Sequence, residues 1–110
     1  MITITPEATK QIHLSAEATN SQGMYLRIVA RREQDGTYIY GMGFDEMGEN
    51  DSLLAAEGLN ILVANALKDF FLGATLDFVE ISPGERQFIF INPNDPAHVA
   101  ATSSGDNSPA

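Results

Sequence analysis

The fold is decided by two stretches in the second half of the chain, Gly73-Ala74-Thr75-Leu76-Asp77-Phe78-Val79-Glu80 and Phe88-Ile89-Phe90-Ile91-Asn92-Pro93-Asn94. Both are rich in β-branched and aromatic residues, and the turn cluster Ser82-Pro83-Gly84 lies between them. This pattern is typical of two strands joined by a tight turn. The sequence therefore predicts one strand over residues 75–81 and a second over 87–91.

The N-terminal half predicts a helix followed by a strand pair. Thr5-Pro6-Glu7 is a helix start, because threonine caps a first turn, proline suits the first helical position and an acid favours the positive end of the helix dipole. We expect this helix to run to about Asn20. Residues 24–32 and 37–44 then alternate as strands around the turn signal Gln34-Asp35-Gly36.

The middle of the chain predicts short strands and a second helix. Apolar runs at residues 53–56 and 59–63 flank Glu57-Gly58, which indicates a tight connection. A short helix is expected over 65–72, with Asn65 as its N-cap and Gly73 in the left-handed conformation at its end.

The sum is a mainly β domain with two short α-helices, an α+β fold, over residues 1–95. Residues 96–110 are rich in Pro, Asn, Ser, Gly and Ala, with few side chains that can pack. We therefore expect them to form a flexible C-terminal tail.

The composition restricts the classes of function. The 110 residues fit one domain, and 6 basic against 15 acidic residues give a net charge of −9. A surface with this charge repels phosphate, which argues against direct binding of nucleic acid or of an anionic membrane. No apolar run approaches the roughly 20 residues that span a bilayer, and the N-terminus lacks the basic start of a signal peptide, so we expect a cytoplasmic protein.

The sequence contains no cysteine. The chain therefore has no disulfide, no thiol nucleophile, no dithiol redox couple and no thiolate for zinc or iron–sulfur ligation.

Several short motifs resemble, in order, those of the A-type iron–sulfur carrier family, also called the HesB-like family. They are the opening Ile-Thr-Ile-Thr-Pro-Glu-Ala, the strand Leu26-Arg27-Ile28, the aromatic residues Tyr40 and Phe44, and the two stretches quoted above. The matching pieces span roughly residues 1–101. The resemblance implies a compact HesB-like β-sandwich or pseudobarrel.

The family motif is a Gly-Cys-Ser-Gly turn after the first long strand and a Cys-Gly-Cys near the C-terminus. Counting from Leu26 places the first family cysteine at Asp35, and counting from Asn92 places the other two at Val99 and Ala101. Soft thiolate ligands select iron–sulfur clusters, and a single aspartate does not replace three of them. The resemblance therefore implies a scaffold with no cofactor held in the family manner.

More narrowly, the chain resembles cysteine-free A-type-like proteins encoded with dissimilatory sulfite reductase in sulfur-oxidising bacteria. That resemblance implies a regulatory role in sulfur oxidation rather than cluster assembly.

The best candidate interaction surface consists of Arg31, Arg32, Asp35 and His98. Two adjacent arginines are conspicuous in a chain with 6 basic residues, and they favour contact with an acidic protein partner. An alternative is a weak metal site formed by Asp35, His98 and carboxylates of the acidic loop. Stable transition-metal sites need three or four ligands, however, so a solvent-exposed tail histidine is the favoured interpretation.

Other patterns do not support catalysis. The acidic cluster Asp45, Glu46, Glu49 and Asp51 lacks the spacing of a calcium loop and reads as a solvated loop. His13 and Glu17 read as a surface pair, and no serine has a base and an elbow motif around it. We therefore expect a non-enzymatic protein that binds an unidentified protein partner. The resemblance implies relatives that assemble partly through their cluster region, and because this chain lacks those thiolates we expect a monomer. The alternative function is residual handling of iron or another metal.

Overall fold

The computed structural model describes residues 2–56 and 59–101. Within them the chain forms eight strands and two helices. In chain order these are β1 (Thr3–Ile4), α1 (Pro6–Ala18), β2 (Tyr25–Arg32), β3 (Tyr38–Asp45), β4 (Asp51–Ala56), β5 (Leu59–Ala64), the 3-10 helix η1 (Asn65–Phe71), β6 (Thr75–Ser82), β7 (Glu85–Ile91) and β8 (Val99–Ala101).

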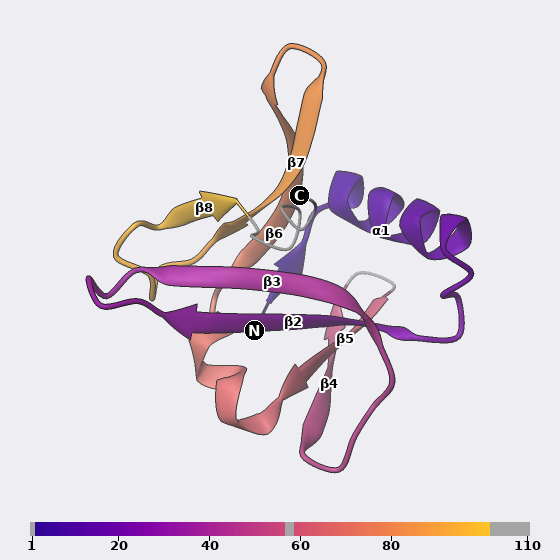
Figure 1. The fold of residues 1–110 in the computed structure, drawn as a ribbon, viewed down its shortest axis with the longest axis horizontal. Helices are drawn as coiled ribbons and strands as arrows, with labels where there is room; N and C mark the ends of the chain where they lie inside the picture. Colours follow the sequence, from indigo (N-terminus) through magenta and orange to yellow (C-terminus); the bar gives the residue numbers. More distant parts are fainter. Residues whose placement is uncertain (1, 57–58, 102–110) are drawn as a thin grey trace.

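The strands form two four-stranded sheets, one in the order β3-β2-β5-β4 and the other in the order β1-β6-β7-β8. The pairs β2–β3, β4–β5 and β6–β7 are antiparallel, whereas β1–β6 and β2–β5 are parallel. Figure 1 shows α1 alongside the β6–β7 hairpin and β8 at the opposite end of the molecule, near the free end of the β2–β3 hairpin. The predicted α+β fold class is confirmed.

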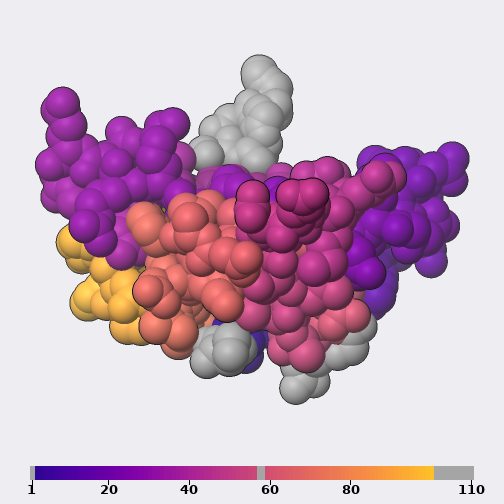
Figure 2. Space-filling view, turned by 90° about the horizontal axis from the view of Figure 1, so that it is seen from below, coloured from indigo at the N-terminus to yellow at the C-terminus, as the bar shows by residue number. Residues whose placement is uncertain are grey.

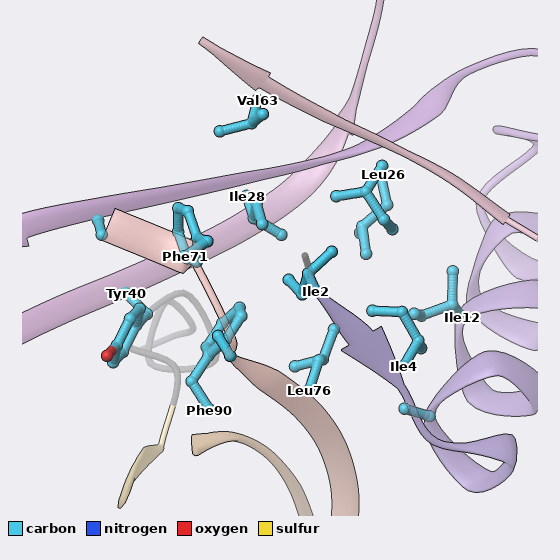
Figure 3. Packing of buried hydrophobic residues seen from close by; sticks show 14 of the residues in the cluster. Ile2, Ile4, Ile12, Leu26, Ile28, Tyr40, Val63, Phe71, Leu76 and Phe90 are labelled. Carbon is cyan, nitrogen blue, oxygen red and sulfur yellow. The ribbon is translucent and has the colours of Figure 1, made fainter. Parts of the chain in front are cut away.

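The hydrophobic core contains the inward-facing side chains of both sheets and of α1 (Figure 3). Buried residues alternate along most of β2 and at the start of β3, so Leu26, Ile28, Tyr38 and Tyr40 point inward. An aromatic group completes the core at one end, where the rings of Tyr40 and Phe90 stack with centroids 4.5 Å apart.

The start of α1 is as predicted. Thr5 is the N-cap and its Oγ1 accepts a hydrogen bond from the backbone N–H of Ala8 at 3.2 Å, with proline in the first turn. The same hydroxyl donates to Asp77 Oδ1 at 2.6 Å, which ties the helix start to β6. The apolar face of α1, Ala8, Ile12 and Ala16, is buried.

The second helix differs from the prediction. It is a 3-10 helix in which Ala64 occupies the N-cap position without a side-chain hydrogen bond, so the prediction that Asn65 caps it is wrong. The Asn65 side chain instead accepts a hydrogen bond from the Ser52 hydroxyl. Gly73 lies at φ 76° after this helix, which confirms its predicted left-handed conformation.

Strand pairing continues past residue 95, the predicted boundary of the domain. Residues 96–98 form a turn, and β8 pairs antiparallel with β7, with Val99 opposite Ile91. The part of the predicted tail over 102–110, and the predicted connection at Glu57-Gly58, lie outside the described residues.

Candidate functional site

Three segments that are distant in the sequence meet at one end of the molecule. They are the β2–β3 turn at residues 33–37, the end of η1 and the segment at 92–101. Figure 2 shows the first in purple, the second in salmon and the third in yellow at the same end, with α1 at the other. The β2–β3 turn and the segment at 92–101 are in close contact, since a Cβ placed on Gly36 would lie 3.7 Å from Pro96 Cγ.

Asp95 is the residue that joins this end of the molecule together. Its side chain is 1% exposed, and its carboxylate accepts hydrogen bonds from the backbone N–H of Tyr38 at 3.3 Å, from the Tyr40 hydroxyl at 2.9 Å and from the backbone N–H of Ala97 at 3.0 Å. Burial of the Tyr40 ring, followed by this hydrogen bond to Asp95, raises the pKa of the Tyr40 hydroxyl well above its usual range. The turn after β7 is therefore fixed to β3.

Two asparagines fix the same turn to the end of η1. Asn92 is fully buried and its Nδ2 donates to the Phe70 carbonyl at 2.6 Å, while Asn94 Nδ2 donates to the Leu72 carbonyl at 2.9 Å. Asn92 Oδ1 also accepts from the Asn94 backbone N–H at 3.0 Å. These bonds satisfy carbonyls that a short helix leaves open at its end.

Asp35, at the first counted cysteine position, is bound within its own turn. Its Oδ1 accepts hydrogen bonds from the Thr37 hydroxyl at 2.6 Å and from the Thr37 backbone N–H at 3.0 Å. These two bonds, the hydroxyl first, lower the pKa of the Asp35 carboxyl from its ordinary value. Asp35 thus stabilises the turn that Gly36 completes at φ 90°.

His98, Val99 and Ala101 belong to the segment that pairs with β7. His98 is exposed, has a positive φ of 63°, and its backbone N–H donates to the Asp95 carbonyl at 2.8 Å. The Asn92 backbone N–H donates to the His98 carbonyl at 2.7 Å. Val99 is 51% exposed. The structure therefore brings the turn of Asp35 and the segment of His98 to one end of the molecule, as the metal hypothesis requires.

The third part of that hypothesis, the acidic loop, lies elsewhere. Asp45 pairs with Tyr25 at the end of the β2–β3 hairpin opposite to its turn. Arg27 engages this loop through Nε to Asp45 Oδ2 at 2.7 Å and through Nη2 to Asp51 Oδ2 at 2.6 Å. Across residues 2–56 and 59–101, no three histidine, aspartate or glutamate side chains lie close enough to hold a metal ion.

The two adjacent arginines play different roles, because neighbouring residues on a strand point to opposite faces. Arg31 Nε lies 2.9 Å from Glu33 Oε2, and its side chain is 73% exposed. The Arg32 guanidinium lies 5.5 Å above the ring centroid of Tyr38 and 5.9 Å above that of Phe70. In the described part of the chain Arg32 has no carboxylate within ion-pair distance, so its charge remains available.

Sequence reasoning did not identify Tyr40, Asn92 and Asp95 as a buried polar group. The signal was partly present, since a polar Asn-Pro-Asn-Asp run directly follows the apolar stretch of residues 88–91. Its partners on β3 and η1 are more than 20 residues away and have no pattern that marks them as donors or acceptors.

The described residues include no helix with the length and apolar character needed to cross a bilayer.

Known proteins similar to this chain share most of its length. The iron–sulfur cluster insertion protein ErpA of Alkalilimnicola ehrlichii is 31% identical over 94 residues, which cover 84% of this chain and 76% of the relative. A putative ErpA of Bordetella avium is 34% identical over 88 residues, covering 79% and 70%. An uncharacterized protein in the nifU 5′ region of Azotobacter vinelandii is 32% identical over 95 residues, covering 86% and 88%. No protein-family profile matches the chain.

Two solved structures share the fold. The crystal structure of IscA with the [2Fe-2S] cluster superposes with a TM-score of 0.71 at 24% identity and covers 93% of this chain and 97% of IscA. Escherichia coli SufA, involved in biosynthesis of iron–sulfur clusters, gives a TM-score of 0.59 at 25% identity, covering 84% and 86%. The chain therefore belongs to the A-type iron–sulfur carrier family of ErpA, IscA and SufA, although its own sequence contains no cysteine.

Proposed function

We propose that this chain is a non-catalytic, cluster-free member of the family that acts by binding a protein partner. The observation that carries the proposal is the absence of cysteine from a chain that keeps the family fold. Iron–sulfur clusters are held by several thiolates, and this donor set is missing. The residues present do not fit a cluster.

The three residues at the positions of the family cysteines, Asp35, Val99 and Ala101, support this proposal. Val99 and Ala101 have hydrocarbon side chains, and the carboxylate of Asp35 is engaged by Thr37. Both hydrogen bonds are accepted by Oδ1, and they fix the orientation of the carboxylate relative to its own turn. The turn is thus better suited to holding its shape than to releasing and accepting cargo.

The proposed contact surface is the group Arg31, Arg32, Asp35 and His98, here called the tip surface. Arg32 is its anchor, because Tyr38 and Phe70 hold the guanidinium in place while no described carboxylate neutralises it. A guanidinium held in this way loses little conformational freedom when it binds a carboxylate of a partner. The rigid turn at Asp95 keeps His98 at the same end.

The biological setting that we propose is regulation of dissimilatory sulfur oxidation, as in the cysteine-free protein DsrR that the chain resembles. The proposal includes a cytoplasmic monomer that does not bind nucleic acid or membranes directly. The net charge of −9 supports the last two points. The gene neighbourhood of this chain is the simplest check: genes for dissimilatory sulfite reductase beside it would support the setting, and their absence would argue against it.

Reconstitution with ferrous iron and sulfide under anaerobic conditions tests the loss of cluster binding. After desalting, we expect no stoichiometric iron or sulfide on the protein and no visible absorption from a cluster. A stoichiometric, visible-absorbing cluster on the purified chain would overturn the proposal.

Affinity capture from the natural host tests the recognition surface. We expect Arg32→Glu to abolish capture of a specific partner, and Arg31→Glu, which changes a residue already paired with Glu33, to weaken capture much less. Equal capture by wild type and Arg32→Glu would show that the tip surface is not the contact.

The second candidate function is weak handling of iron or another metal by Asp35 and His98. The observation that favours it is the placement of their two segments at one end of the molecule. Titration with ferrous and ferric iron, followed by Asp35→Ala and His98→Ala, discriminates the two functions. Binding that both substitutions abolish would support metal handling, whereas binding that neither changes would eliminate it.

A further inference from the structure

A second surface, far from the tip surface, lies between α1 and the β6–β7 hairpin, which stand side by side in Figure 1. It is a hollow of about 390 Å³, lined by Pro6, Glu7, Lys10, Gln11, Leu14, Phe78 and Arg86. The hollow thus combines one exposed face of a helix with side chains of a strand pair.

Arg86 is held in position within this hollow. Its guanidinium lies 4.6 Å from the centroid of the Phe78 ring, within the range of a cation–π contact. The Phe78 ring is itself packed against Phe88, with centroids 4.7 Å apart. The guanidinium therefore rests on a supported aromatic surface rather than extending into solvent.

Three carboxylates of β6 and β7 accept hydrogen bonds from neutral donors. Asp77 accepts from the Thr5 hydroxyl at 2.6 Å and from the Phe78 backbone N–H at 2.8 Å. Glu80 is opposite Arg86 in the β6–β7 register but accepts from the Gly84 backbone N–H at 3.0 Å. Glu85 accepts from the Ser82 hydroxyl at 2.7 Å.

As a result, two cations in the hollow lack a carboxylate partner. Neither Lys10 nor Arg86 has an aspartate or glutamate oxygen within ion-pair distance in the described part of the chain. Together with Glu7 they give the hollow a formal charge of +1 (two cations minus one carboxylate), although the whole chain carries −9. This local reversal of sign is suited to an acidic ligand.

The hollow also offers apolar surface. Leu14 is 48% exposed and lies on the same face of α1 as Lys10 and Gln11. Phe78, on β6, is half-buried and also lines the hollow. Side chains three or four residues apart lie on the same helix face, so Lys10 and Leu14 present their charged and apolar groups side by side. A ligand with both a carboxylate and an aliphatic group matches this arrangement.

We propose that the hollow between α1 and the β6–β7 hairpin binds a short acidic and aliphatic segment of a partner protein. A carboxylate of that segment lies between Lys10 and Arg86, and an aliphatic side chain lies on Leu14 and Phe78. Glu7 and the strongly negative chain disfavour a polyphosphate or nucleic acid in the same place. This site does not depend on the tip surface or on the loss of the cluster.

The test is a titration of the full-length, ¹⁵N-labelled chain with the blocked peptide acetyl-Glu-Leu-Leu-Glu-amide, followed by backbone amide spectra. We expect saturable shifts confined to α1 and the β6–β7 hairpin. Arg86→Gln and Lys10→Gln should each weaken binding of the acidic peptide by up to about fivefold, the loss expected for one exposed charge pair. The matched peptide acetyl-Gln-Leu-Leu-Gln-amide loses the pairs to both cations and should therefore bind more weakly than the acidic peptide binds to either variant.

Lys68→Gln is the control, because it removes an exposed cation of η1 outside the hollow and should leave binding unchanged. The proposal is overturned if the acidic peptide gives no saturable shifts, or if Lys68→Gln weakens binding as much as Arg86→Gln. Shifts of the same amides that depend on protein concentration without peptide would identify a second copy of the chain as the occupant and would also contradict it.

Discussion

The hydroxyl of Tyr40 donates a hydrogen bond of 2.9 Å to the buried carboxylate of Asp95, 55 residues later in the chain. Tyr40 lies on β3 of one sheet, and Asp95 lies in the turn that leads from β7 to β8 of the other. The bond therefore joins the two sheets at the end of the molecule that carries Asp35 and His98.

Asp95→Ala should lower the free energy of unfolding by about 3 kcal/mol, because it removes a buried acceptor from three donors. Urea denaturation followed by circular dichroism measures the loss. Asp69→Ala, at an exposed position of η1, is the control and should change the free energy by less than about 0.5 kcal/mol. A loss for Asp95→Ala no larger than that of the control would show that the carboxylate does not hold this turn.

Gly73→Ala should destabilise the fold by about 1–2 kcal/mol, because residue 73 has a φ of 76° that a side chain disfavours. A Cβ there would also lie 3.4 Å from Pro93 Cγ. Gly23→Ala is a matched control, since a Cβ at residue 23 has open space around it and the backbone is not left-handed. Similar unfolding midpoints for the two variants in urea would contradict the account of the η1–β6 connection.

The stability of the chain should fall as the pH decreases from about 4 to about 2. Hydrogen bonds from Arg27, and then from the Gly48 backbone N–H, lower the pKa of the Asp51 carboxyl from 3.8 to about 2. Between these values the unfolded chain binds more protons than the folded chain, so the stabilisation is present above this window and is lost below it.

Arg27→Gln should reduce this acid dependence, because the Asp51 pKa then returns toward its ordinary value. Urea midpoints at several pH values between about 2 and 6 measure the slope for both proteins. Parallel losses of stability in wild type and Arg27→Gln would show that the ion pair does not cause the dependence.

Arg32→Ala should cost about 0.5–1 kcal/mol of stability, since it removes the guanidinium from Tyr38 and Phe70. Arg31→Ala, whose side chain is 73% exposed beside Glu33, should cost less than about 0.5 kcal/mol. Differential scanning calorimetry resolves this difference. The reverse order would mean that Arg31, rather than Arg32, is the arginine held in a fixed position.

Local patterns predicted most of the secondary structure. Thr5-Pro6-Glu7 predicted the start of α1, alternation predicted β2 and β3, and the turn cluster Ser82-Pro83-Gly84 predicted the strand pair β6–β7. These signals depend on a few neighbouring residues. The prediction that Asn65 caps η1 was wrong, because the Asn65 side-chain carbonyl accepts a hydrogen bond from the Ser52 hydroxyl of the neighbouring strand β4. The N-cap preference of asparagine does not account for a hydrogen-bond partner that comes from another strand.

The sequence did not predict β8 or the turn that precedes it. The proline, alanine and histidine residues at 96–101 read as a tail, but Asp95 and Asn92 attach the preceding turn to β3 and η1. The order is imposed by tertiary hydrogen bonds to residues more than 20 positions away. The sequence also placed Arg31 and Arg32 side by side, whereas the strand directs them to opposite faces, so the sequence alone could not show that Arg32 lies over Tyr38 and Phe70.

The central claim is that the family fold was kept while its cluster ligands were lost at residues 35, 99 and 101. The most direct measurement is anaerobic reconstitution with iron and sulfide of wild type and of the variant Asp35→Cys/Val99→Cys/Ala101→Cys, with bound iron, sulfide and visible absorption recorded for both. We predict no cluster on wild type and a visible-absorbing cluster on the triple variant. A cluster on wild type, or none on a folded triple variant, would contradict the account.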